Sequence, residues 1–211
     1  MQIVREDVFK DSFIESQVQQ CLTDAFFEKV ACFTSQTNAK RLFRSSLHTG
    51  LYSLLPRLVC YDTDGSVKGV LVLRLAKQKL NLLKFTYTIL LALITCNVLK
   101  VLEALRFSHH LSCFEERKCS HKFGMVPEVL FVATHKNSRG KGVGTQLLSE
   151  CHDWLRSQGF HSVGLIVYES NPAVHLYERF GYKVTDRISC SKFPNVRGTK
   201  YETFLWMEAD L

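Results

Sequence analysis

The segment Arg139-Gly140-Lys141-Gly142-Val143-Gly144 combines three glycines with two basic side chains. Glycine lets the backbone adopt positive φ and lets its N–H groups approach a ligand without a Cβ in the way. A β-type run at 126–134 precedes this segment, and a helical pattern follows it. A helix that begins after such a turn presents free N–H groups and the positive end of its dipole, which together bind phosphate or pyrophosphate. We therefore predict an anion-binding loop here.

Three other interpretations of this loop fit less well. A Walker-type phosphate loop needs Ser or Thr directly after Gly-Lys, whereas Gly142 follows Lys141. A dinucleotide fingerprint places its third glycine three positions after the second in an early βαβ unit, whereas Gly144 stands two positions after Gly142 and a hairpin pattern comes before. A bare glycine-rich turn would have no need of the charges on Arg139 and Lys141.

A second block, 171–182, reads Asn-Pro-Ala-Val-His-Leu-Tyr-Glu-Arg-Phe-Gly-Tyr. With the spacing Arg139-x-x-Gly142-x-Gly144, it resembles the GNAT superfamily of N-acetyltransferases. That family has an acetyl-CoA loop of Arg or Gln, two residues, Gly, one residue, Gly or Ala, and a later Asn-x-x-Ala-x-x-Leu-Tyr-x-x-x-Gly-Phe motif. Here the alanine comes one place early and Tyr182 replaces Phe. The resemblance is close over 124–190, and the first 75 residues match only in the order of their elements.

The resemblance implies acetyl-CoA as co-substrate, an amine as acceptor, and direct transfer in a ternary complex without a covalent enzyme intermediate. It also implies that the pyrophosphate lies on the loop backbone at 140–145 and that the pantetheine arm pairs with the preceding strand. No metal is expected. The cofactor-binding residues that it implies are Val132, Ala133, Thr134, Arg139, Gly140, Lys141, Gly142, Val143, Gly144, Thr145 and Asn171.

Two side chains are candidates for proton transfer. An amine of pKa about 10 must lose a proton before it attacks, and the departing CoA thiolate needs a proton donor. Tyr177 matches the family tyrosine that the resemblance implies as general acid; the alternative is an aromatic residue that packs on the sheet. Glu128 is the candidate base, because period-2 alternation places it on the face of Leu130, Val132 and Thr134. A solvated glutamate at a strand start, a water molecule as base, and His135 are the alternatives.

The helices and strands that must position these residues are predicted from hydrophobic periodicity and from the residues typical of helix ends and turns. We expect strands at 2–9, 58–61, 67–75, 126–134, 163–168, 182–190 and 201–208, and helices from 11 or 12 to about 29, at 38–48, from 143 to a stop at Gly159, and from Asn171 as cap to Gly181. Asp62 to Gly65 predicts a tight hairpin turn. The resemblance implies a mixed α/β fold with a central, mostly antiparallel sheet and helices on both faces.

Residues 76–122 stand where the family has a short hairpin between its third and fourth strands. We therefore expect one domain, 1–211, with a helical insertion between strands three and four. The uncharged run 85–99 has 15 residues, fewer than the roughly 20 that span a membrane. We favour a helix that packs over the core or forms a homodimer contact; membrane association is the less favoured alternative.

The polar end of this insertion, 109–122, is rich in metal-ligand side chains: His109, His110, Cys113, Cys119 and His121. Zinc ligands usually come in pairs two to four residues apart, and only part of this set complies. We therefore predict a polar loop near the acceptor cleft rather than a metal site.

The composition narrows the class of protein. With 46% hydrophobic and 22% charged residues among 211, the chain can build a core without disulfides or metal. The net charge of +7 suits a phosphorylated cofactor, but the basic residues are scattered, so no nucleic acid is expected. Eight cysteines without a C-x-x-C pair or a secretory signal predict reduced thiols in a cytoplasmic protein. The alternative function is a CoA-binding sensor or membrane-associated module with little or no transfer activity.

Overall fold

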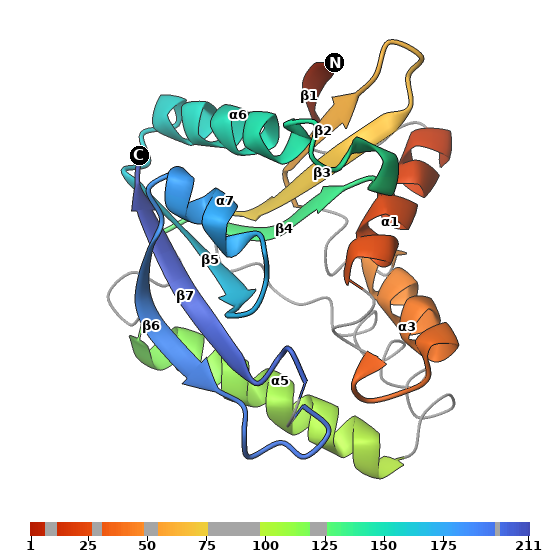
Figure 1. The fold of residues 1–211 in the computed structure, drawn as a ribbon, viewed down its shortest axis with the longest axis vertical. Helices are drawn as coiled ribbons and strands as arrows, with labels where there is room; N and C mark the ends of the chain where they lie inside the picture. Colours follow the sequence, from red (N-terminus) through yellow and green to blue (C-terminus); the bar gives the residue numbers. More distant parts are fainter. Residues whose placement is uncertain (7–11, 27–30, 49–54, 76–97, 119–125, 197–198) are drawn as a thin grey trace.

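The computed structural model describes residues 1–6, 12–26, 31–48, 55–75, 98–118, 126–196 and 199–211 (Figure 1). The strands are β1 (Gln2–Glu6), β2 (Arg57–Tyr61), β3 (Val67–Arg74), β4 (Glu128–Thr134), β5 (Ser162–Tyr168), β6 (Lys183–Ser189) and β7 (Thr203–Asp210). The helices are α1 (Ser12–Phe26), α3 (Gln36–His48), α5 (Val98–Lys118), η1 (Lys136–Ser138), α6 (Val143–Ser157) and α7 (Val174–Arg179). The predicted ends of the first strand and first helix, and the apolar run at 85–97, lie outside the described residues.

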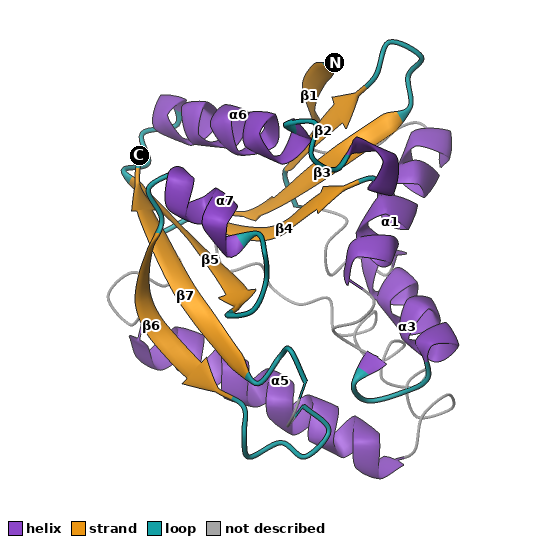
Figure 2. Cartoon of the chain, in the orientation of Figure 1, coloured by secondary structure: helices purple, strands orange, loops and turns teal. Residues whose placement is uncertain are grey.

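The strands form one seven-stranded sheet in the order β1-β2-β3-β4-β5-β7-β6 (Figure 2). Every neighbouring pair is antiparallel except β4 and β5, which are parallel. The β2–β3 hairpin turns at the predicted place, where Gly65 has φ +77° and its N–H donates to the Asp62 carbonyl. The mostly antiparallel sheet is therefore confirmed, while the single-domain boundary at 1–211 stays a prediction.

Helices cover both faces of the sheet, as predicted (Figure 1). One face carries α6 and α7, whose Leu147, Leu148 and Tyr177 join the largest buried cluster. On the other face, α1 and α3 pack against β2, β3 and β4 in a second cluster, and α5 packs over β6 and β7 in a third. On this second face each half of the sheet has its own cluster, with the parallel β4–β5 pair between them, whereas the cluster under α6 and α7 spans both halves.

A glycine brings the first turn of α6 onto the sheet. A Cβ added to Gly69 on β3 would stand 2.6 Å from Val143 Cγ1 and 3.0 Å from Leu147 Cδ1. Real Cβ atoms do not approach so closely, so any larger residue at 69 would push the helix away. The absence of a side chain at 69 therefore fixes where the N-terminus of α6 stands beside β4.

The insertion forms helix α5 between β3 and β4, as predicted, but its polar end differs from the prediction. A polar loop was predicted from His109 onward, whereas α5 continues to Lys118. Tertiary contacts explain the helix: the His110 ring lies 5.3 Å from the Phe193 ring, and its Nε2 lies 3.3 Å from the Ser189 carbonyl oxygen. These contacts tie the helix to the β6 end of the sheet.

The predictions about a membrane span, the metal-ligand side chains and a homodimer contact concern residues that are only partly described. Within the described ranges, no helix is long and apolar enough to cross a membrane. His109, His110 and Cys113 lie on α5, whereas Cys119 and His121 lie outside the described residues. The homodimer contact stays a prediction. Of the eight cysteines, Cys21, Cys32, Cys60, Cys151 and Cys190 are free thiols, and burial raises the pKa of Cys151 to about 12.

Candidate active site

The sheet opens between β4 and β5. These strands pair through only two residue pairs, Glu128 with Gly164 and Val129 with Leu165. Beyond them β4 remains paired to β3 as far as Thr134, and β5 remains paired to β7 as far as Tyr168. The β4 edge from 130 to 134 therefore has no strand beside it among the described residues, and its backbone groups can pair with an extended ligand.

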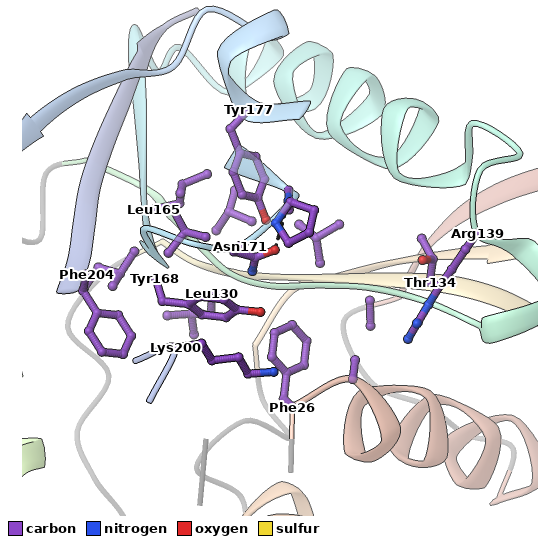
Figure 3. A pocket seen from close by; sticks show the side chains of 18 of the residues that line it. Phe26, Leu130, Thr134, Arg139, Leu165, Tyr168, Asn171, Tyr177, Lys200 and Phe204 are labelled. Carbon is purple, nitrogen blue, oxygen red and sulfur yellow. Dashed lines mark hydrogen bonds between the residues drawn. The ribbon is translucent and has the colours of Figure 1, made fainter. Parts of the chain in front are cut away.

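A cavity of about 590 Å³ fills this opening. Its walls come from β4, β5, the turn at 171–173, Tyr177 of α7, the loop at Arg139 and Gly140, and the end of α1. Because α7 and α1 lie on opposite faces of the sheet, the cavity is accessible to groups from both faces (Figure 3). Such a passage can bring two reactants together in the gap between the strands.

The glycine loop has the geometry of an anion cradle. Gly140 has φ +73° and Gly142 has φ +79°, both in the left-handed region, and no heavy atom lies within 4 Å of a Cβ built at either position. Gly142 precedes α6 and no side chain caps that helix. The N–H groups of its first turn, Val143 to Thr145, therefore have no partner within the helix. With Arg139 and Lys141 exposed beside them, these groups fit a pyrophosphate.

Gly144, the third glycine of the loop, allows two helices to pack closely rather than allowing a ligand to approach the backbone. A Cβ at Gly144 would stand 3.2 Å from Leu176 Cδ2 on α7 and 3.9 Å from Thr134 Cγ2 on β4. This close approach lets α7 lie against α6 above the gap between the strands. Gly144 thus connects the loop to the helix that carries Tyr177.

Tyr177 points from α7 into the cavity (Figure 3). Burial is the main cause that raises the pKa of its phenol above the ordinary value of 10, so the hydroxyl is protonated at neutral pH but is a weaker acid than an exposed tyrosine. Asn171 also lines the cavity, and its Oδ1 accepts a hydrogen bond of 2.9 Å from the Ala173 N–H. Asn171 therefore caps the turn that leads into α7, one turn before the helix itself begins at Val174.

Glu128 does not lie where alternation predicted. The β3–β4 register shifts between Val72, opposite Phe131, and Leu73, opposite Val129, so Leu130 is an extra residue in β4. This β-bulge reverses the alternation. Val129 and Val132 both pack in the cluster of α6 and α7, so Glu128 lies on the opposite face.

The surroundings of Glu128 also differ from those of an exposed base. Glu128 is buried, is absent from the cavity wall, and forms an ion pair with Arg74, its cross-strand neighbour. The predicted site residues that the structure brings together at the cavity are Val132, Ala133, Thr134, Arg139, Gly140, Asn171 and Tyr177. The other predicted loop residues, Lys141 to Thr145, lie next to the cavity, where α6 begins. Glu128 stays a hypothesis for the base, and its position does not favour that role.

A buried histidine behind Tyr177 was not predicted. His152 on α6 is 4% exposed, and its Nε2 lies 3.0 Å from the Tyr182 hydroxyl. The Tyr182 ring in turn lies 5.8 Å from the Tyr177 ring, and the Tyr182 N–H donates to the Tyr177 carbonyl oxygen. One feature of the sequence could have predicted a polar partner here. The family motif has Phe where this chain has Tyr182, and a buried hydroxyl needs a hydrogen-bond partner.

The far end of the cavity is aromatic and was also missed. Phe26 from α1, Tyr168 from β5 and Phe204 from β7 line it, together with Lys200 (Figure 3). These residues come from three distant parts of the chain, so no local sequence motif predicts that they lie together. Figure 3 places Arg139 and Lys200 at opposite ends of the cavity.

Comparison with known families identifies the class of this site. Residues 110–182 match the model of the acetyltransferase (GNAT) family. Over these residues the chain is similar to the GNAT acetyltransferases. The matched residues include β4, the glycine loop, β5 and α7, which contribute to the cavity wall, and also α6, which follows the loop. The resemblance found in the sequence is therefore confirmed.

Solved structures of N-acetyltransferases share the fold of this chain. A mosquito arylalkylamine N-acetyltransferase like 5b superposes with a TM-score of 0.63 at 15% identity, over 100% of both chains. A GCN5-related N-acetyltransferase from Kribbella flavida has a TM-score of 0.56 at 17% identity, over 99% of this chain and 98% of its own. The Paia N-acetyltransferase of Thermoplasma acidophilum, in complex with coenzyme A, has a TM-score of 0.56 at 14% identity, over 100% of both chains. At the level of sequence, no curated protein matches the chain.

Proposed function

We propose that this GNAT domain transfers an acetyl group from acetyl-CoA to a primary amine by direct attack in a ternary complex. The observation that carries the proposal is the cavity between β4 and β5, with the glycine loop at one end and the Tyr177 phenol inside it. The cavity has walls from both faces of the sheet, as a site for two substrates requires.

The chain's own residues would bind the donor at three places. The backbone N–H groups at 140–145 and the side chains of Arg139 and Lys141 would hold the pyrophosphate. Val132, Ala133 and Thr134, on the open β4 edge, would pair with the pantetheine arm as a neighbouring strand does. Asn171 would fix the turn that closes over this arm, through its hydrogen bond to Ala173.

Bound acetyl-CoA would supply the acetyl thioester: the amine nitrogen bonds to the carbonyl carbon, the C–S bond breaks, and the sulfur keeps its electron pair. Tyr177 would then donate its phenolic proton toward that sulfur, because its hydroxyl lies at the cavity and is protonated at neutral pH. The amine loses its own proton to water or to a base. Glu128 remains a candidate for that base, although its carboxylate is paired with Arg74.

A second candidate function is a CoA-binding module without transfer activity. One observation favours it: the carboxylate predicted to act as base is absent from the cavity wall. Both functions predict acetyl-CoA binding, but only the transferase predicts release of free thiol, so a single experiment separates them.

The experiment measures acetyl-CoA binding by calorimetry and free-thiol release over a broad amine panel, for wild type and Tyr177→Phe. The transferase is expected to bind acetyl-CoA saturably and to release thiol only when a suitable amine is present. Tyr177→Phe should bind acetyl-CoA as wild type does and lose about a hundredfold in kcat, within the range that general acids contribute. Tyr61→Phe, on β2 and two strands from β4, is the control and should keep wild-type activity.

The outcomes decide between the functions. Saturable acetyl-CoA binding without thiol release for any amine would favour the binding module. Absence of acetyl-CoA binding at sub-millimolar concentration would overturn both. Equal kcat values for wild type and Tyr177→Phe would remove Tyr177 from the proton-transfer role and leave its packing role.

A further inference from the structure

We propose that the Tyr168 hydroxyl accepts a hydrogen bond from the nitrogen of the acceptor amine and thereby aims the nitrogen lone pair at the acetyl carbon. This inference rests on the proposed transfer from acetyl-CoA, and it assigns a second tyrosine, besides Tyr177, to that reaction. Tyr168 is the last residue of β5, across the gap from the open edge of β4.

Tyr168 lies at the end of the cavity that is remote from the glycine loop. Its side chain lines the cavity, and the Lys200 ammonium lies 5.5 Å from the centroid of its ring. Lys200 and Arg139 stand at opposite ends of the cavity (Figure 3). If the pyrophosphate of the donor occupies the loop beside Arg139, the second substrate binds toward the Tyr168 end.

The hydroxyls of Tyr168 and Tyr177 point into the same part of the cavity. In Figure 3 the Tyr177 phenol extends from α7 and the Tyr168 phenol extends from β5 toward the space between them. The two groups also interact electrostatically, because burial raises the pKa of Tyr177 most and Tyr168 raises it further. Two hydroxyls that converge in this way can serve one reacting carbon, one at the departing sulfur and the other at the attacking nitrogen.

Neighbouring rings hold the Tyr168 ring in place. Tyr201, which is buried, meets it edge to face, with the ring centroids 5.0 Å apart and an interplanar angle of 83°. Tyr201 in turn stacks on Phe204, with centroids 6.2 Å apart and an angle of 13°. A side chain that is already ordered loses little entropy when it binds a ligand. The Tyr168 hydroxyl is therefore placed to orient a substrate atom.

The segment that carries Tyr201 is anchored on two sides. Glu103 of the insertion helix α5 accepts hydrogen bonds from the backbone N–H and the side-chain amide of Asn195. On the other side, the Ser170 hydroxyl donates to the Lys200 carbonyl oxygen at 3.3 Å. The insertion thus supports the ring against which Tyr168 packs.

The Tyr168 hydroxyl is available to a ligand. In the described part of the chain, Tyr168 contacts Tyr201 and Lys200 through its ring, and no group hydrogen-bonds to its hydroxyl. Burial raises the pKa of this phenol above the ordinary value of 10, so it is neutral at pH 7. A neutral phenol oxygen accepts a hydrogen bond from an N–H group and keeps its own proton.

This hydrogen bond acts on the nitrogen without moving the Tyr168 proton. A neutral primary amine has two N–H groups and one lone pair, so an N–H group directed at Tyr168 leaves the lone pair to face the acetyl carbon. As the N–C bond forms and the C–S electron pair moves to sulfur, the nitrogen becomes positively charged. Its N–H group is then a better donor, so the hydrogen bond strengthens in the transition state. The nitrogen afterwards loses a proton to water or to a base.

The test compares Tyr168→Phe with wild type by thiol release, with phenethylamine and with the best acceptor of the amine panel. Phenethylamine is a suitable probe because its ring matches a wall that includes Phe26 and Phe204. Tyr168→Phe keeps the ring that packs on Tyr201 and removes only the hydroxyl. We expect kcat/KM for the amine to fall about tenfold, the scale of one hydrogen bond to a group that gains charge. Acetyl-CoA affinity in calorimetry should stay at the wild-type value.

Tyr61→Phe is the matched control, because it removes a phenol hydroxyl from β2, outside the cavity wall. It should change neither quantity. A second readout needs no turnover: calorimetry with CoA present should show that phenethylamine binds more weakly to Tyr168→Phe than to wild type. Tyr177→Phe should bind phenethylamine as wild type does, because its hydroxyl serves the sulfur.

The possible results separate this inference from the proposed function. If no amine is acetylated but phenethylamine binding still depends on the Tyr168 hydroxyl, the transfer function fails and the amine-binding role stands. If acetylation proceeds with equal kcat/KM in wild type and Tyr168→Phe, the role of Tyr168 is overturned while the transfer function stands. Equal losses of acetyl-CoA and amine affinity in Tyr168→Phe would also overturn it, because the hydroxyl would then support the whole cavity. Amine binding that is indifferent to Tyr168, in a chain without activity, would overturn both.

Discussion

His152 should make the stability of this protein fall in mild acid. Burial lowers the pKa of His152 from 6.5 to about 4, with a smaller contribution from the cation of Arg156. Above pH 6.5 the ring is neutral in both the folded and the unfolded chain and contributes nothing to the pH dependence. Below pH 6.5 the unfolded chain binds a proton that the folded chain does not, so the free energy of unfolding decreases, and the loss levels off below about pH 4.

The size of this loss follows from the two pKa values. A shift from 6.5 to about 4 lowers the free energy of unfolding by about 2 kcal/mol at pH 5 and by about 3 kcal/mol at the acid limit. His152→Gln keeps an amide that can hydrogen-bond to Tyr182 and removes the titration. Urea unfolding at pH 7.5, 6 and 5 should therefore show that wild type loses about 2 kcal/mol more than His152→Gln between pH 7.5 and 5.

The control for this measurement is His161→Gln. His161 is exposed and precedes β5, so its replacement should leave the pH dependence of wild type unchanged. Parallel pH dependence in wild type and His152→Gln would refute the reasoning, because it would mean that the buried ring takes up its proton without cost.

Three further predictions concern the glycines and the candidate base. Gly142→Ala and Gly65→Ala place a Cβ at φ +79° and +77° in open space, so each should lower the free energy of unfolding by about 1 kcal/mol; only Gly142→Ala should weaken acetyl-CoA binding in calorimetry. Gly164→Ala brings a Cβ within 2.6 Å of the Trp206 ring and should cost about 1–3 kcal/mol in urea unfolding; stability equal to wild type would contradict this packing. Glu128→Gln should lower the free energy of unfolding by about 1–3 kcal/mol through loss of a buried charged partner and leave the pH profile of kcat/KM unchanged, whereas loss of the acidic limb of that profile would restore Glu128 as base.

The geometry of the glycine loop and of the turn at Asn171 could be predicted because it is local. The positive φ values of Gly140 and Gly142, the start of α6 after them, and the cap formed by Asn171 all depend on residues within a few positions. Short-range rules for turns and helix ends therefore apply. The order of strands and helices followed from periodicity for the same reason.

The face on which Glu128 lies could not be predicted, because a β-bulge depends on how two strands pair. Leu130 is an extra residue only in relation to β3, where Val72 and Leu73 face Phe131 and Val129. Nothing in the sequence of β4 alone marks that residue, and alternation then gives the wrong face for every residue before it. The helical state of residues 109–118 likewise depends on contacts with distant residues, as His110 shows with Phe193.

The aromatic end of the cavity is the most non-local part of the site, and this has a consequence for substitutions. Phe204 lines the cavity on one side, and its ring lies 6.1 Å from the Phe107 ring of α5. Phe107 also contacts the rings of Phe33 and Phe193, so α5 supports the wall from behind. A Phe107→Ala substitution, which touches no residue of the donor loop, should therefore alter acceptor KM while acetyl-CoA affinity stays at the wild-type value. A matching loss in acetyl-CoA affinity would show instead that α5 supports the whole sheet, and that donor and acceptor ends are not independently built.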